Sequence, residues 1–201
     1  MANTHGMDEI LPLLKDAAWP GREQSVCAPL TDLPIQDQPL VTFGWDRPET
    51  FEMLGRQDPL AANLDVLRAA AAANLKKRAG SWQPIEIKLG LFKTGRFLVC
   101  GDDFLAAERI LDPDFLMQAQ RTLDAKMLAV GIPRRGIIMA ANGAQSSELL
   151  QRFLAAVAGQ FHRGEAPPIT PTVFGVVDGA IVAHLQDGGV SAMVKDSLRR
   201  Q

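Results

Sequence analysis

Residues 127–185 read MLAVGIPRRGIIMAANGAQSSELLQRFLAAVAGQFHRGEAPPITPTVFGVVDGAIVAHL. The stretch opens with two short apolar segments, at 127–130 and 137–141, and a turn with two glycines separates them. Short apolar runs that contain β-branched residues and are flanked by glycine favour strands over helices. We therefore expect a β-hairpin at the start of this stretch.

An amphipathic helix is predicted next, over residues 146–161. Ser146 or Ser147 can accept a backbone hydrogen bond as its cap. Gly164 is expected to end it in a left-handed conformation. The spacing of the apolar side chains is helical, so this face should lie on a sheet. These side chains are Leu149, Leu150, Phe153, Leu154, Val157, Ala158 and Phe161.

A proline-rich segment and a second hairpin complete the stretch. The prolines of residues 167–171 exclude a helix and require an extended crossing. Asp178 and Gly179 then stand between two β-branched runs. Asp-Gly in this position is one of the strongest short signals for a tight hairpin turn.

The rest of the chain shows the same alternation of hairpins and helices. Hairpins are predicted over residues 40–54 and 85–100, and a helix over 60–79. Another helix is predicted over 104–123, with a restart at Asp112. A short helix is also expected over 8–18. Asp58 and Asp112, each followed by proline, are typical N-cap residues.

This order predicts an α+β fold. We expect one antiparallel sheet built from repeated β-hairpin–helix units, with the helices packed on one face. Residues 1–39 are predicted to form an N-terminal helix and an irregular segment. Residues 40–187 should form a single α+β domain, and residues 188–201 a C-terminal tail.

Composition and charge exclude several classes of protein. The 201 residues suffice for one substantial core, and 47% hydrophobic with 22% charged residues is ordinary for a globular protein. The net charge of −2 and the lack of a basic tract beyond residues 76–78 argue against a nucleic-acid partner. No apolar run approaches the length of about twenty residues that spans a membrane. No secretion signal precedes the domain, so a cytoplasmic location is expected.

Few side chains in the sequence suggest chemistry. Cys27 and Cys100 are interpreted as reduced thiols. The acidic cluster of Asp102, Asp103 and Glu108 could hold a cation or act as an acid–base pair, but helix capping is the simpler interpretation. His5, His162 and His184 have no partners at zinc-ligand spacing. No catalytic residue, metal or cofactor is predicted.

Several polar and aromatic residues are candidates for binding. Asn74 falls near the apolar stripe of its helix, where its amide either ties the helix to a neighbouring strand or faces a ligand. Arg109 has the same two interpretations. Trp45 and Trp82 stand at predicted element edges, where exposed aromatic rings would mark a contact surface. Arg134 and Arg135, at a hairpin tip, could meet an acidic partner, although such tips are usually solvated.

Four segments resemble a bacterial family of unknown function. They are Asn74-Leu75, AERIL at 107–111, IIMAAN at 137–142, and PIT at 168–170. Through them, residues 40–185 resemble the YtpQ-like bacterial proteins. That family usually has an aspartate at the position of Ala106 and an acidic residue at that of Asn142. The resemblance implies no reaction, cofactor or substrate.

Two hypotheses of function follow. The first is a non-catalytic bacterial protein of the cytoplasm that binds another protein through a sheet face or through the edge that carries Trp45 and Trp82. It could also form a homodimer through an unpaired sheet edge. The alternative is a small-molecule-binding protein or an enzyme. Its pocket would be lined by Asn74, Asp103, Arg109 and Asn142.

Overall fold

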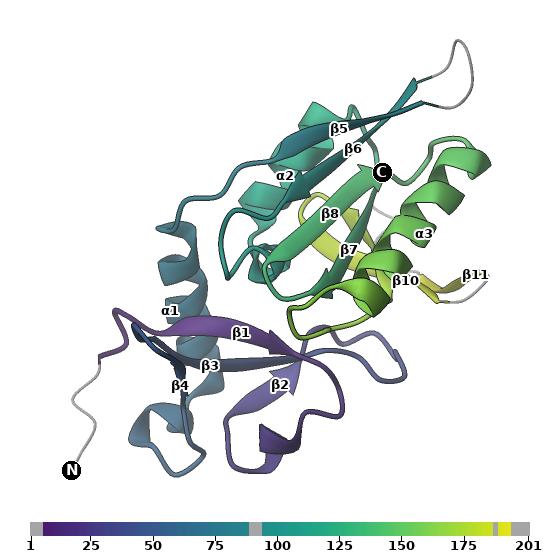
Figure 1. Cartoon of the computed structure of the whole chain (residues 1–201). Helices are drawn as coiled ribbons and strands as arrows, with labels where there is room; N and C mark the ends of the chain where they lie inside the picture. Colours follow the sequence, from purple (N-terminus) through teal and green to yellow (C-terminus); the bar gives the residue numbers. More distant parts are fainter. Residues whose placement is uncertain (1–5, 89–93, 187–188, 194–201) are drawn as a thin grey trace. The chain divides into compact units, whose positions relative to one another are not determined.

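The computed structural model describes residues 6–88, 94–186 and 189–193, with side chains up to Leu185. The chain divides into two compact units (Figure 1). Unit 1 comprises Met1–Leu30 and Asp37–Ala79, and unit 2 comprises Thr31–Gln36 and Gly80–Gln201. The predicted division at residue 39 therefore differs from the observed one, because strands on both sides of that position pair within unit 1.

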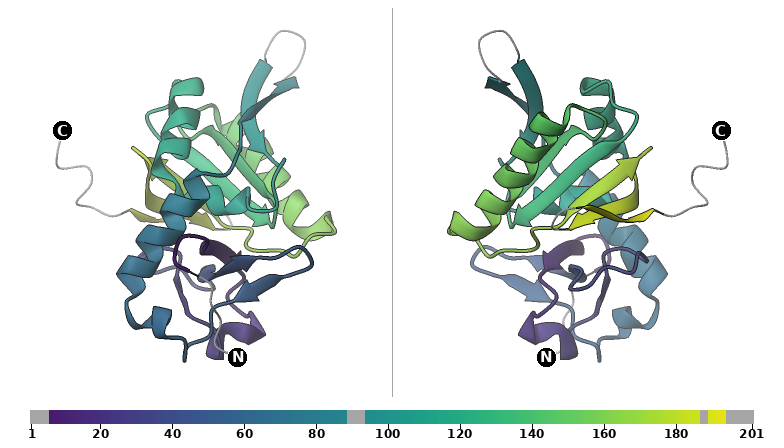
Figure 2. Two further views of the ribbon diagram at one scale, coloured as in Figure 1. Left: turned by 90° about the vertical axis from the view of Figure 1, so that its left-hand side faces the viewer. Right: turned by 90° about the vertical axis from the view of Figure 1, so that its right-hand side faces the viewer.

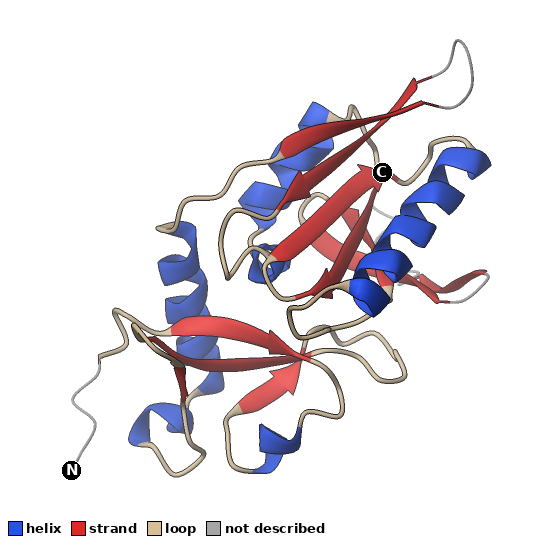
Figure 3. Ribbon diagram, viewed as in Figure 1, coloured by secondary structure: helices blue, strands red, loops and turns tan. Residues whose placement is uncertain are grey.

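The sheet of unit 1 is built around β3, Leu40–Asp46. β1, Leu11–Lys15, pairs antiparallel with one edge of β3. β2, Cys27–Pro29, and β4, Phe51–Met53, pair with it antiparallel as well. The α1 helix, Leu64–Lys76, packs against β1 (Figure 3). The predicted hairpin over 40–54 is confirmed by β3 and β4.

The predicted N-terminal helix over 8–18 is wrong, because this segment forms β1. Leu11, Leu13 and Leu14 are all buried, so the strand is covered on both faces. A strand buried on both faces is a continuous apolar run, which periodicity alone does not distinguish from a helix. The pairing of β1 with β3, which lies far along the chain, selects the strand.

The predicted helix over 60–79 is divided in two. Asp58 accepts a hydrogen bond from the Leu60 backbone (2.9 Å) as predicted, but it caps a 3₁₀ turn, η2, at Pro59–Ala62. Asn63 is extended, with φ −133°, and its side chain accepts from Val66 N at 3.1 Å. Asn63 is therefore the cap of α1, and an unrecognised cap residue explains the error.

Unit 2 contains a seven-stranded antiparallel sheet in the order β11-β10-β9-β7-β8-β6-β5. The predicted hairpins over 85–100, 127–141 and around Asp178 are confirmed. The predicted tail contains a strand, β11, that pairs with β10. The strands are β5 Gln83–Lys88, β6 Thr94–Cys100, β7 Leu128–Arg134, β8 Ile137–Asn142, β9 Val173–Val177, β10 Ala180–Gln186 and β11 Gly189–Met193.

Helical segments cover both faces of this sheet, not one as predicted (Figure 2). The α3 helix, Ser147–Arg163, packs on the face that carries Met139 and Ala141. The η3 turn, Ala107–Leu111, and α2, Pro113–Thr122, belong to the opposite side. Every central residue of β8 is apolar and buried, so both faces of the sheet need a cover. The described residues contain three α-helices, and strands dominate, so a strict hairpin–helix repeat is not observed.

Two local predictions are confirmed by geometry. Asp112 accepts hydrogen bonds from Asp114 N (3.1 Å) and Phe115 N (3.4 Å), so it restarts the helical segment as α2. Asp178 and Gly179 both have positive φ, +50° and +78°. This is the backbone of a type I′ turn, which matches the twist of the two strands it joins.

Arg134 closes the C-terminal end of α3. Its guanidinium donates to the carbonyls of Gln160, Phe161 and Ala166, and the residue is 5% exposed. Gly164 is extended, with φ −89°, so the predicted left-handed stop is wrong. Glycine is needed there for space, because a Cβ would overlap the Arg134 guanidinium.

Among the described residues, no helix has both the length and the apolar character needed to cross a bilayer.

Candidate functional site

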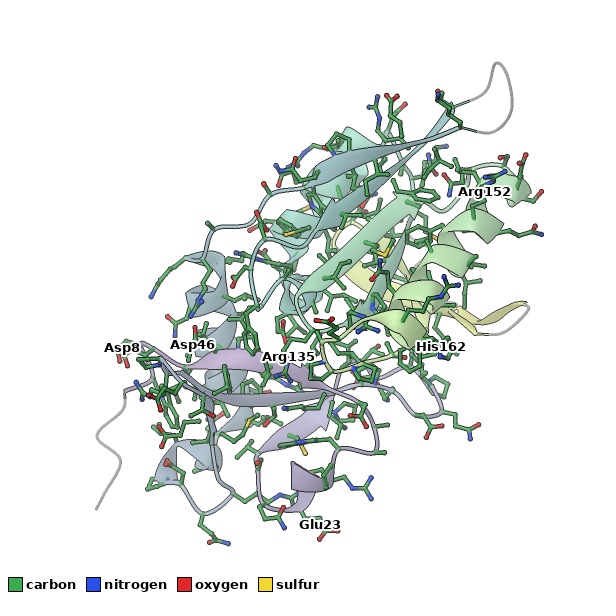
Figure 4. All side chains as sticks on the ribbon, viewed as in Figure 1. Asp8, Glu23, Asp46, Arg135, Arg152 and His162 are labelled. Carbon is green, nitrogen blue, oxygen red and sulfur yellow. The ribbon has the colours of Figure 1, made fainter. Side chains whose placement is uncertain are left out.

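A pocket of about 400 Å³ lies in unit 2. It forms where the loop after β6, the β7–β8 turn and the proline-rich crossing meet. Its lining consists of residues 101–104, Arg135, Gly136, Ala166 and Pro167. We call it the Arg135 pocket; Arg135 is labelled in Figure 4.

Backbone contacts fix the walls of this pocket. Arg135 N donates to Pro167 O at 3.0 Å, and Ile169 N donates to Pro133 O at 2.9 Å. These bonds hold the proline-rich crossing along the end of β7. Gly136 has φ +75°, a conformation that glycine adopts without strain and that makes the turn tight. The pocket is therefore part of the folded framework of unit 2.

Arg135 and Phe104 provide the chemistry of the pocket. The guanidinium carbon of Arg135 lies 5.0 Å from the centre of the Phe104 ring, within cation–π range. Its Nε is buried and has no hydrogen-bond acceptor among the described residues. Burial lowers the pKa of Arg135, and the charge of the nearby Glu108 opposes that effect. The pocket thus contains a partly desolvated cation with one donor unused.

Phe104 is the exposed apolar component of the same site. Its side chain is 43% exposed, whereas the two residues that follow it, Leu105 and Ala106, are fully buried. A large aromatic ring on the rim of a pocket favours contact with another molecule.

The two aspartates of the pocket also support local structure. Asp103 Oδ1 accepts from Leu105 N at 3.3 Å and so supports a turn. The helix predicted from residue 104 is a turn followed by η3, whose N-cap is Ala106, so the predicted capping role of Asp103 is wrong. Asp102 Oδ1 accepts a hydrogen bond from Cys100 Sγ at 3.2 Å. Glu108, the third member of the predicted acidic cluster, is fully buried.

The Cys100 thiol is expected to be unreactive in the folded protein. Burial, followed by the hydrogen bond to Asp102 and its charge, raises the pKa of Cys100 to about 11. At about pH 8, roughly one thiol in a thousand would be ionised. Titration with a chromogenic disulfide reagent should show one fast thiol, Cys27, and a second released only by denaturant. Cys27→Ser should abolish the fast phase, and rapid native reaction of Cys100 would contradict the assignment.

His184 is a second buried ionisable group, on β10. It is 2% exposed, and neither ring nitrogen has a hydrogen-bond partner among the described residues. The sheet register places it in a row with Leu98, Ala140, Val130 and Phe174, between Phe174 and the position of Ala192 on β11. Burial in this row lowers the pKa of His184, so the imidazole is neutral in the folded protein.

Acid is expected to destabilise the protein through His184. Below the ordinary pKa of 6.5, the unfolded chain binds a proton at His184 that the folded chain does not. The free energy of unfolding should therefore fall with decreasing pH, by at most about 1.4 kcal/mol per pH unit from this group. Urea denaturation at about pH 7.5 and 5.5 measures it. His184→Leu should reduce the dependence on pH, and His162→Gln, at an exposed histidine, should leave it unchanged.

Both candidate tryptophans contact their own unit. Trp45 is 1% exposed, and its indole N–H donates to Gly6 O at 3.3 Å. Trp82 stacks on Phe115 with ring centres 4.6 Å apart and donates to Phe115 O at 3.0 Å. Trp45 is buried and Trp82 is half-buried, so neither ring presents a contact surface in this structure.

Asn74 has the structural role that its position in the helix suggests. Its amide nitrogen donates to Met7 O (3.0 Å) and Ile10 O (2.9 Å), and its oxygen accepts from Lys77 Nζ (2.8 Å). The amide therefore ties α1 to the segment that enters β1. These contacts leave little of the amide for a ligand.

The other candidates of the alternative hypothesis do not share one pocket. Arg109 is 3% exposed. Its Nη1 lies 3.6 Å from Asp112 Oδ2, and its guanidinium packs over the Phe115 ring. Asn142 ends β8 and accepts from Ala144 N at 2.9 Å. Of the predicted pocket residues in unit 2, only Asp103 lines the Arg135 pocket.

Sequence reasoning missed Phe104 and undervalued Arg135. Phe104 stood at the start of a predicted helix, where an apolar residue suggests a core position. Arg135 stood at a hairpin tip, where charged residues are usually solvated. Only the approach of the proline-rich crossing, about thirty residues further along the chain, turns this tip into a pocket wall.

No family model, curated protein or solved structure matches the chain. The resemblance to the YtpQ-like proteins therefore stays a prediction.

Proposed function

We propose that this chain is a non-catalytic protein-binding module whose contact surface is the Arg135 pocket together with the Phe104 ring on its rim. The observation that carries the proposal is the pairing of an exposed aromatic ring with a partly desolvated arginine at one pocket. Aromatic residues and arginine are enriched among the residues that dominate binding at protein interfaces.

The openness of the pocket favours a protein segment over a small molecule. Sites for small molecules typically enclose most of the ligand surface. The Arg135 pocket is widely open to solvent, so a small ligand would stay largely exposed. A loop or an extended segment of a partner would cover both Phe104 and the pocket floor.

The unused donor of Arg135 indicates the polar part of the contact. A partner carboxylate or carbonyl oxygen could accept from Nε and relieve the cost of burying the cation. The partner would pack an apolar group against Phe104 and Pro167. An acidic partner was one interpretation of Arg135 from the sequence alone.

A photo-crosslinking amino acid in place of Phe104 tests the proposal in host cells. Discrete protein adducts should form at position 104 and should be lost when Arg135→Gln is added. The matched control is position 66, because Val66 is also an exposed apolar residue, at 52%, but lies in unit 1. Absence of adducts at 104, or the same adducts at both positions, would refute the proposed surface.

The alternative, a small-molecule site or an enzyme formed by Asn74, Asp103, Arg109 and Asn142, has less support. Asn74 and Arg109 are engaged by neighbouring groups, and Asp103 alone lines a pocket. We also propose a cytoplasmic location for the module, in keeping with two free thiols.

A further inference from the structure

β5 forms one edge of the seven-stranded sheet, and among the described strands it pairs only with β6. Every residue of β5 except Ile87 is exposed, and Ile85 is 43% exposed. β6 pairs with β8 only through Leu98–Cys100, so much of the β5–β6 hairpin extends beyond the neighbouring strand (Figure 1). An exposed edge of this kind carries backbone groups that another strand can bind.

Pro84 indicates which backbone groups of β5 face the free edge. Proline in a sheet is placed on an edge strand with its missing N–H directed outward. The N–H and C=O groups alternate in direction along a strand, residue by residue. The backbone groups of Glu86 and Lys88 therefore face outward with those of Pro84, and those of Ile85 and Ile87 face β6.

We infer that β5 is the site at which a second copy of this chain binds, in an antiparallel pairing centred on Ile87. In this register Glu86 lies opposite the second copy's Lys88, and Lys88 lies opposite the second copy's Glu86. Both are outward-facing residues, so each pair can exchange two backbone hydrogen bonds. Opposite charges then stand directly across the new interface, where they stabilise the pairing.

No other two-fold register of the described strand satisfies both charge and hydrogen bonding. A two-fold pairing must set residues of the same face opposite each other, so it is centred on a residue. Centring on Glu86 or Lys88 opposes two like charges. Centring on Pro84 or Ile85 sets Pro84 opposite an outward-facing residue of the described strand, in a pair that requires the N–H it lacks. Centring on Ile87 pairs only Glu86, Ile87 and Lys88 among the described residues, so Pro84 takes no part in those pairs. Ile87 is the remaining centre.

Side chains on both faces of the β5–β6 hairpin also favour the pairing centred on Ile87. Ile87 packs against the core cluster, the buried group that includes Phe97, Met139 and Phe153, and pairing would bring the Ile87 side chains of the two copies together. On the other face, Glu86 lies opposite Arg96, with their charged atoms 3.8 Å apart. The row Arg96, Glu86 and the second copy's Lys88 then alternates in sign. This surface shares no residue with the Arg135 pocket, so the inference is independent of the proposed function.

A charge-exchange series tests the pairing by analytical ultracentrifugation of the purified chain. The wild-type chain should dimerise at concentrations up to about 100 μM, a range that detects weak pairing. Glu86→Lys and Lys88→Glu should each weaken dimerisation at least about tenfold, because symmetry creates two like-charge pairs in each variant. The double variant Glu86→Lys/Lys88→Glu should regain the wild-type affinity to within about threefold.

Each result has a defined meaning. A wild-type chain that stays monomeric would overturn the inference, and β5 would then be a protected edge whose proline and charges prevent pairing. A dimer that neither single variant weakens would place the contact elsewhere and would also overturn it. A double variant as weak as the single ones would refute the Ile87-centred register. Unchanged circular dichroism should confirm that the exposed substitutions leave each chain folded.

Discussion

Phe153→Ala is expected to lower the free energy of unfolding by about 4 kcal/mol. Phe153 lies on the buried face of α3, and its side chain is fully buried. Its ring meets Phe97 edge to face, with centres 5.1 Å apart and planes at 73°. Alanine would remove this contact and leave a cavity in the core cluster. Urea denaturation followed by circular dichroism measures the loss.

The neighbouring residues of α3 provide the controls for this prediction. Leu154 is only partly buried, so Leu154→Ala should cost less, about 1–2 kcal/mol. Gln151 is exposed, and Gln151→Ala should change stability by less than about 0.5 kcal/mol. Equal losses at positions 151 and 153 would show that α3 does not pack as described.

Arg134→Ala should cost about 3 kcal/mol of stability, for a different reason. Its guanidinium donates charge-assisted hydrogen bonds to three carbonyls at and beyond the end of α3. Removal leaves these partly buried acceptors without their donor, and α3 loses a cation at the negative end of its dipole. The exposed Arg163, also at this end, is the matched control, and Arg163→Ala should have little effect.

Gly164→Ala tests whether the stability provided by Arg134 depends on the position of its guanidinium. A Cβ at Gly164 would overlap the Arg134 guanidinium, so this substitution should displace the same hydrogen bonds and cost about 2 kcal/mol. Once Arg134 is alanine, the space is free, and the second substitution should cost little. The double variant should therefore be more stable than the sum of the single losses implies. Strict additivity would show that the two residues do not interact.

Sequence reasoning failed in three places, for two physical reasons. The N-terminal strand β1 was predicted as a helix because both of its faces are buried, and burial on both faces removes the periodic signal. The second cap at Asn63 was missed because the stronger Asp58-Pro59 signal stood just before it. The helices cover two faces of the sheet because β8 is apolar on both, a feature that a short apolar run does not reveal.

The candidate site was less predictable than the fold. Asp103 was assigned to a pocket and also to a helix cap; it lines the pocket, but its side chain supports a turn and caps no helix. Arg135 was assigned to a turn but not to a pocket, and Phe104 was not identified as an exposed ring. Trp45 and Trp82 were expected at a contact edge, yet each donates its indole N–H to a backbone carbonyl of its own unit.

The sequence by itself determined the features that depend on neighbours along the chain. These include the Asp178-Gly179 turn, the caps at Asp58 and Asp112, and the apolar face of α3. Tertiary structure alone decided that residues 11–15 form a strand, that Arg134 closes α3 and that Arg135 faces a pocket. Each of these depends on groups about thirty residues apart in the chain, whose approach follows from packing and not from local preference.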